Sequence, residues 1–278
     1  MAKTKAADTV KPVDELIGGD KLDPKEGVNA INKLISTDHV QVILGSAASS
    51  VTLAMAPIAE KNKVILFSSI STSDKLKESG DYIFRNVPRN AIQGKTSAEF
   101  LYNQLVKKKA AIFNKNDEYG TNLAKSFKER FIELGGNIVF EDSYQPQTSD
   151  FRAAIAKIRS SGAEGVFTPG NYQETALLLR QSKESKLNAI FVGGDGSYSP
   201  ELINIAGNSA EGSYYTLMSV DKEGAYYKNF HEKFVKQYQR DPDIYDAYAY
   251  EAGMLILESI HKVGYNADIN FMQIVSSK

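Results

Sequence analysis

Short apolar runs rich in β-branched residues alternate with segments of helical periodicity through most of this 278-residue chain. The runs are apolar on both faces, which is typical of parallel strands that are covered by helices on either side. Strand–helix alternation of this kind predicts an α/β doubly wound architecture with mostly parallel sheets. The predicted strands are 40–45, 63–68, 82–87, 109–114, 137–142, 164–169, 189–194 and 212–218.

Helix start signals support the segments between these strands. Asp23 stands directly before Pro24, which is an N-cap followed by proline at the first helical position. The predicted helices are 24–37, 50–61, 91–107, 119–134, 150–161, 172–185, 199–206, 224–239 and 244–263.

Composition excludes several classes of function. A net charge of −1 argues against a nucleic-acid-binding surface, and no run reaches the roughly 18 apolar residues of a direct membrane span. The chain has no cysteine, and none of its three histidines has a partner at metal-ligand spacing, so neither a metal nor another cofactor is predicted. The first residues lack an apolar signal core. They predict a cytosolic chain, or one that lost a targeting segment and gained a start methionine.

Loops past the carboxyl ends of strands carry function in α/β folds. Here 45–50 and 68–73, which follow the first two strands, are almost entirely small residues with many hydroxyls. Hydroxyls and backbone N–H groups at helix N-termini suit a carboxylate, whereas Asp195, after strand 189–194, suits an ammonium group. Together these features describe an α-amino-acid site. The alternative is that each cluster is a helix cap or a turn.

The same loops lack the signatures of common enzymes. Neither serine-rich loop contains G-x-S-x-G, and no histidine lies in the loops to act as the base of a Ser-His-Asp triad. The segment GSAASSVT has no phosphate-loop lysine, and GGDGSY is not a dinucleotide-binding motif. The sequence therefore predicts a binding protein and not an enzyme, with a flavodoxin-like enzyme as the remaining alternative.

The chain resembles the branched-chain (Leu/Ile/Val-type) amino-acid binding proteins of ABC importers, which have the type I periplasmic binding protein fold. The stretch DPKEGVNAINKLI resembles a family pattern D-P-x-x-A-V-x-x-x-N-K-L, and VILGSAASSVTLAMAPIAEKNKVILFSSIST aligns without a gap to the family's first ligand loops. The resemblance covers about residues 20–263. Further matching segments are YIFRNVPRNAIQGKTSAEFL, IFNKNDEYGTNLAKSF, the run 151–187, IFVGGDG, LINIAGNSAEGSYY and DPDIYDAYAYEAGMLI.

This resemblance implies a function without catalysis. The protein is expected to be a two-lobe receptor at the periplasmic or extracellular surface that binds a small amino acid or amide. It would present the ligand to the membrane subunits of an ABC importer. Neither nucleic acid nor cofactor is expected.

The resemblance also implies roles for individual residues. Ser49 matches the hydroxyl that holds the ligand carboxylate, and Thr72 matches a position that serves both ends of the ligand. Ile70 matches a backbone carbonyl that meets the amine, and Asp195 stands where the family has a longer acid for the ammonium. The full predicted ligand set is Ser49, Ile70, Ser71, Thr72, Tyr119, Asn171, Tyr172, Asp195 and Tyr245. Tyr119 matches the tyrosine that closes on the ligand, and either Asn171 or Tyr172 matches a ligand-facing tyrosine. Tyr245 matches an aromatic position of the side pocket.

The chain departs from the family at both ends. The first strand and helix of the family, and a helix and hairpin before its last strand, have no counterpart here, and INFMQIVSSK resembles that last strand. Lobe 1 is therefore predicted as 1–88 plus 218–278, incomplete or rearranged, and lobe 2 as 89–217. The alternative is a truncated or engineered derivative of the fold with impaired or no ligand binding, for which a homodimer is the expected assembly.

Overall fold

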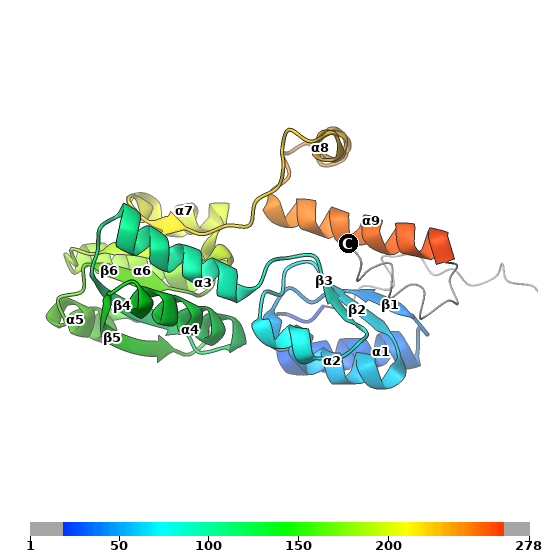
Figure 1. Ribbon diagram of the computed structural model, residues 1–278, viewed down its shortest axis with the longest axis horizontal. Coiled ribbons are helices and arrows are strands. Elements are labelled where there is room, and N and C mark those ends of the chain that lie inside the picture. The colour runs from blue at the N-terminus through cyan, green and yellow to red at the C-terminus, as the bar shows by residue number, and fades with distance from the viewer. Residues whose placement is uncertain (1–18, 264–278) are drawn as a thin grey trace, which may run out of the picture. The chain divides into compact units, whose positions relative to one another are not determined.

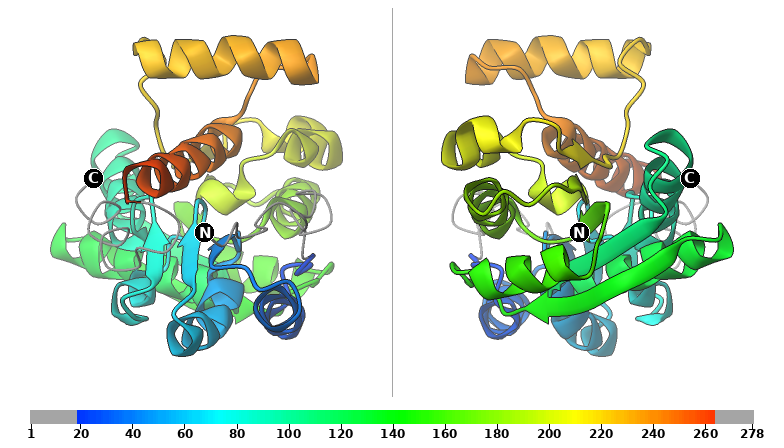
Figure 2. Two further views of the ribbon diagram at one scale, coloured as in Figure 1. Left: turned by 90° about the vertical axis from the view of Figure 1, so that its right-hand side faces the viewer. Right: turned by 90° about the vertical axis from the view of Figure 1, so that its left-hand side faces the viewer.

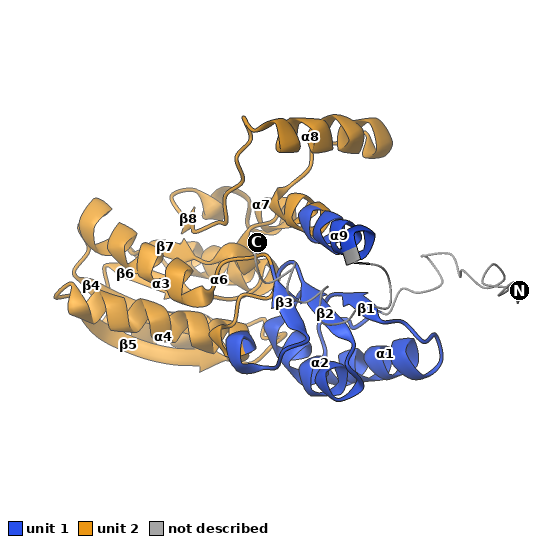
Figure 3. Cartoon of the chain, turned by 45° about the vertical axis from the view of Figure 1, so that its right-hand side comes forward, with its two compact units in different colours: residues 1–70, 76–85, 251–278 blue, residues 71–75, 86–250 orange. Residues whose placement is uncertain are grey.

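The computed structural model describes residues 19–263, which form two compact units (Figure 3). Within that range, unit 1 holds 19–70, 76–85 and 251–263, and unit 2 holds 71–75 and 86–250. Each unit has a parallel sheet with helices on both faces, which confirms the predicted α/β class. The predicted final strand INFMQIVSSK lies outside the described residues, and the predicted lobe limits remain a prediction.

Unit 1 is built on a sheet with strand order β1-β2-β3. Ile31 of α1 and Val51 of α2 pack with Leu66 on one face of the sheet, while Ala252 and Ile256 of α9 pack with Phe67 on the other. Figure 1 shows α1 and α2 together on one side of these strands. The elements are α1 (Pro24–Ser36), β1 (Val42–Leu44), α2 (Ser49–Asn62), β2 (Ile65–Ser68) and β3 (Ile83–Arg85), with two elements shared with unit 2: the 3₁₀ turn η2 (Asp74–Glu78) and α9 (Ile244–Val263), which enters unit 1 at Glu251.

Unit 2 is built on a larger sheet with strand order β5-β4-β6-β7-β8. Phe127 of α4 stacks on Phe167 of β6 with ring centroids 4.1 Å apart, in the core beneath α3 and α4. The opposite face carries a second core, in which Ile155 of α5 and Leu179 of α6 pack with Val166. The elements are α3 (Asn90–Glu99), η3 (Phe100–Gln104), β4 (Lys109–Lys115), α4 (Glu118–Glu133), β5 (Asn137–Tyr144), α5 (Arg152–Ser160), β6 (Gly165–Thr168), α6 (Tyr172–Glu184), β7 (Ile190–Gly193), η4 (Asp195–Ser197), α7 (Pro200–Ala206), η5 (Gly207–Ala210), β8 (Tyr214–Tyr215) and α8 (Ala225–Tyr238).

Local sequence signals explain where helices begin. The Asp23 side chain accepts hydrogen bonds from the backbone N–H groups of Lys25, at 2.8 Å, and Glu26, at 3.2 Å, so the predicted cap of α1 is confirmed. Asp117 caps α4 in the same way by accepting from the N–H of Gly120. Tyr119, a predicted site residue, therefore stands in a helical turn whose start is fixed by a side chain.

Two element predictions were wrong in extent. The predicted helix 91–107 is α-helical only to Glu99, because the N–H of Leu105 reaches the carbonyl of Phe100 and makes a π-helical turn. Phe100 and Leu101, which open that turn, both contact the core beneath α3. The predicted strand 212–218 shrinks to Tyr214–Tyr215, because it pairs with β7 only at these two positions.

Helix α8 lies apart from the sheet layers of unit 2 (Figure 2). Phe230 is its only buried residue, and its ring packs on Tyr250 with centroids 4.7 Å apart. The helix therefore contributes little to the two cores of unit 2.

Candidate ligand-binding site

Asp195 is the buried acid at the centre of the candidate site in unit 2. It follows β7 directly and opens the short turn η4, and 3% of the residue is exposed. The Tyr119 hydroxyl donates to its Oδ1 at 2.7 Å, and the N–H of Gly196 donates to that hydroxyl oxygen at 3.0 Å. The predicted residues Tyr119 and Asp195 are thus brought together, although 76 positions separate them in sequence.

The electrostatics of this pair follow from its burial. Burial raises the pKa of Asp195 above its usual value, while the hydrogen bond from the Tyr119 hydroxyl and the nearby Gln93 amide and Gly196 N–H act in the opposite direction. Burial, and then the charge of Asp195, raise the pKa of Tyr119 well above its ordinary value, so its hydroxyl stays protonated and donates. No ion pair joins Asp195 to a basic side chain of the described residues.

Gln93 is a residue of this site that sequence reasoning missed. Its Oε1 accepts from the backbone N–H of Asp195 at 3.3 Å, which ties the buried face of α3 to the turn that carries the acid. Between them lies Gly194, where a Cβ would come within 2.4 Å of the Tyr119 Oη and 2.7 Å of the Gln93 Oε1. Only glycine allows this close approach. A polar residue on the buried face of a helix was the signal in the sequence.

Tyr245 also reaches Asp195, but at its backbone. Its hydroxyl donates to the Asp195 carbonyl oxygen, so it braces the turn and does not touch the carboxylate. Asn171 and Tyr172 lie at the start of α6, the first as the helix cap and the second as its first residue. Neither forms a hydrogen bond with Asp195 in the described part of the chain, and their ligand roles remain predictions.

Ser71 and Thr72 belong to unit 2 by their contacts. The carbonyl of Thr72 accepts from the N–H of Asn90 at 2.8 Å, and the Asn90 amide reaches the carbonyl of Tyr119 at 3.4 Å. The residues that follow are anchored as well, because the Ser73 hydroxyl donates to Glu118 at 3.0 Å. The segment 71–75 is therefore tied to the same helix that presents Tyr119.

Ser49 and Ile70 belong to unit 1. Ser49 is the first residue of α2 and is 2% exposed, and no side chain caps that helix. The neighbouring hydroxyls are used structurally, because Ser68, at 2.7 Å, and Thr52, at 3.1 Å, both donate to the carbonyl of Ser46. Part of the hydroxyl-rich sequence therefore fixes the loop, as the cap-and-turn interpretation expected.

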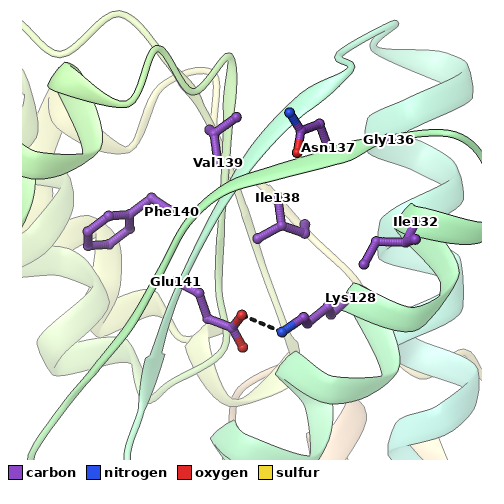
Figure 4. Close-up of a pocket in the computed structure, with 8 residues that line it drawn as sticks. All are labelled: Lys128, Ile132, Gly136, Asn137, Ile138, Val139, Phe140 and Glu141. Carbon is purple, nitrogen blue, oxygen red and sulfur yellow. Dashed lines mark hydrogen bonds and ion pairs between the residues drawn. The ribbon is translucent and has the colours of Figure 1, made fainter.

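A hollow lies beside the edge strand β5, away from the carboxyl end of the sheet (Figure 4). It is lined mainly by the first half of β5, and Lys128 pairs with Glu141 across it at 2.6 Å.

Between Gly19 and Val263, no cluster of three or more acids or histidines is arranged to hold a metal ion. Over the same stretch, no helix has the length and apolar character needed to cross a membrane.

Comparisons with known proteins agree with this architecture. Residues 11–272 match the family described as periplasmic binding protein. A Leu/Ile/Val-binding protein homolog 1 from Brucella suis is 29% identical over 251 residues, which is 90% of this chain and 67% of that protein.

Two solved structures extend the likeness to three dimensions. The leucine binding protein of Thermotoga maritima has a TM-score of 0.89 at 28% identity, and the match covers 93% of this chain and 74% of that one. A branched-chain amino acid transporter substrate binding protein from Streptococcus pneumoniae, solved with isoleucine, has a TM-score of 0.84 at 26% identity and the same coverage. The family match, which runs through nearly the whole sequence, and the two-unit α/β fold lead to one conclusion: this chain belongs to the periplasmic binding protein family.

Proposed function

We propose that this protein is an extracytoplasmic receptor for a small apolar L-amino acid and delivers it to the membrane subunits of an ABC importer. One observation carries the proposal. Asp195 is a buried carboxylate that has hydrogen-bond donors around it but no cationic partner among the described residues. A buried charge is stabilised when it is paired, and an amino-acid ammonium group is the missing cation.

The other end of the ligand is assigned to the hydroxyl-bearing segments. Ser49 at the start of α2 and the buried pair Ser71 and Thr72 offer hydroxyls and backbone N–H groups, which suit a carboxylate. The names of the relatives favour leucine, isoleucine and valine as the first ligands to test. A chain that only binds needs no general acid or base, and Tyr119 and Asp195 are assigned to recognition alone.

Isothermal titration tests this function. The protein is unfolded in guanidinium and refolded to remove any ligand carried through purification, and folding is checked by circular dichroism. L-leucine, L-isoleucine and L-valine are then titrated beside N-acetyl-L-leucine, which keeps the carboxylate and side chain but has no ammonium group.

We expect one site per chain for at least one free amino acid and a much weaker interaction with N-acetyl-L-leucine. Equal binding of the acetylated ligand would remove Asp195 from its assigned role. Absence of heat with every free amino acid, from protein that is demonstrably folded, would refute the receptor function and support a derivative of the fold that no longer binds.

A further inference from the structure

Segment 71–75 follows a strand of unit 1 but is held within unit 2. The buried Ser73 hydroxyl donates to Glu118 Oε1 at 3.0 Å, and the Lys75 ammonium group donates to Glu118 Oε2 at 2.7 Å. Glu118 is the first residue of α4. Both oxygens of one carboxylate at the start of α4 therefore hold this segment.

Asp74, between those two residues, is fixed through its backbone and through its side chain. Its backbone N–H donates to the Asn122 side chain at 3.3 Å, and its Oδ2 accepts from the N–H of Ala91 at 3.0 Å. The second contact satisfies the N-terminus of α3, where the N-cap residue Arg89 makes no capping bond of its own. The segment therefore bridges the N-termini of α3 and α4.

We propose that Glu118 is a positioning residue of the receptor, whose carboxylate holds segment 71–75 and so fixes Ser71 and Thr72 for the ligand carboxylate. The proposal rests on the function proposed above, which places these two residues among those that bind the ligand carboxylate. Both are buried, so a small shift of the segment would move their hydroxyls and N–H groups out of register with a bound ligand.

The place of Glu118 in the chain gives the proposal its physical basis. The next residue, Tyr119, donates to the Asp195 carboxylate at 2.7 Å, where the ligand ammonium group is assigned. Asp117 caps the same turn by accepting from the N–H of Gly120 at 2.8 Å. The groups assigned to the two ends of the ligand therefore share one capped helical turn, and Glu118 links that turn to the carboxylate end.

A local role for Glu118 is the competing explanation, because an acid in the first turn stabilises a helix through its dipole. Ser73→Ala separates the two roles, since it removes the donor to Glu118 and leaves the acid on α4 in place. Glu118→Gln keeps an acceptor for Ser73 and removes the charge, whereas Glu118→Ala removes both. Glu141→Ala is the control, because Glu141 accepts from Lys128 at 2.6 Å beside β5, elsewhere in unit 2 (Figure 4).

Three measurements are made on the wild type, these four variants and the Ser73→Ala/Glu118→Ala double variant. Thermal unfolding reports the structural cost of each change, and calorimetry with L-leucine reports affinity. Hydrogen exchange of backbone amides, followed by NMR in the ligand-free protein, reports local opening. The Asp74 amide is the reporter for the segment, because it donates to Asn122 and to neither mutated side chain.

We expect Ser73→Ala and Glu118→Ala each to weaken binding of L-leucine about tenfold, because a hydrogen bond to a charged group is lost from the segment that carries Thr72. The double variant should bind as Glu118→Ala does, since both changes remove the same contact. Exchange at the Asp74 amide should be faster in all three. Glu118→Gln should lose at most about threefold, because an ion pair with an exposed lysine contributes little. Glu141→Ala should match the wild type in affinity and in Asp74 exchange.

Unchanged Asp74 exchange in Ser73→Ala would overturn the proposal, and so would wild-type affinity in a variant whose exchange is faster. Faster exchange in α4 but not at Asp74 in Glu118→Ala would also overturn it, because the acid would then act only on its own helix. If Glu118→Ala does not fold, Ser73→Ala decides the question by the same readouts. The exchange measurement needs no ligand. Its outcome is therefore separate from that of the wild-type titrations, which test the receptor function itself.

Discussion

Replacing Asp195 with asparagine should change affinity and stability in opposite directions. Asparagine keeps the size of the side chain and one acceptor oxygen for the Tyr119 hydroxyl, 2.7 Å away, but removes the negative charge. A ligand ammonium group would then be buried without a counter-charge. Breaking a buried charge pair costs about 3–5 kcal/mol, which corresponds to a loss of affinity of about 150- to 5000-fold.

The ligand-free protein should respond differently. Because burial raises the pKa of Asp195, the folded state holds a proton on this group more tightly than the unfolded chain does. Stability therefore falls as pH rises from the ordinary aspartate pKa of about 3.9 through the raised value in the folded protein. Asparagine is neutral at every pH. The melting temperature of Asp195→Asn, relative to that of the wild type, should therefore rise as pH increases across this window.

The assays are titration calorimetry with L-leucine and thermal unfolding of ligand-free protein at several pH values. Asp221→Asn is a suitable control, because Asp221 is an exposed acid elsewhere in unit 2. Two results would refute the reasoning: retained affinity in Asp195→Asn, or a drop in its melting temperature that is the same at pH 4 and pH 7. The first would show that Asp195 does not meet the ammonium group, and the second that its burial costs the folded protein nothing.

Three further substitutions test other contacts. Tyr119→Phe should weaken binding of L-leucine in calorimetry about tenfold, because the donor to Asp195 is lost, and unchanged affinity would remove Tyr119 from the site. Gly170→Ala should lower the free energy of unfolding by about 1–3 kcal/mol, because its Cβ would lie only 1.9 Å from the Tyr144 Oη. That cost should shrink in a Tyr144→Phe background, and an equal cost in both backgrounds would contradict the clash. Asp23→Ala should lower the free energy of unfolding by about 1 kcal/mol in denaturant titrations, whereas Asp23→Ser keeps a cap and should lose less.

The sequence predicted the elements of this fold well because each is encoded locally. The period of the apolar residues distinguishes strands from helices, and Asp23-Pro24 marks the start of α1 almost to the residue. The π-helical turn after Glu99 could not be predicted, because it arises from packing of Phe100 and Leu101 in the core and from no local signal.

The candidate site was predictable only in part. Asp195 and Tyr119 stand in loops where α/β folds place ligands, and the family resemblance supplied their roles. Gln93 lies 102 positions from Asp195, and only the approach of α3 to α4 brings the two together. The sequence likewise gave no sign that the segment 71–75, which follows a strand of unit 1, makes its contacts in unit 2.

The buried acid links the cost of folding to the selection of ligands. A carboxylate that is buried without a cation destabilises the ligand-free folded protein. The polar groups of Gln93, Tyr119 and Gly196 offset only part of this cost. Under the proposed function, a free amino acid would remove the remainder, because its ammonium group would supply the counter-charge. A ligand of the same shape without that group would leave the acid buried and unpaired, and would lose far more affinity than a missing methyl group costs. If Asp195 meets the ligand as proposed, the same arrangement that lowers the stability of the ligand-free protein would also allow it to reject ligands that lack an ammonium group.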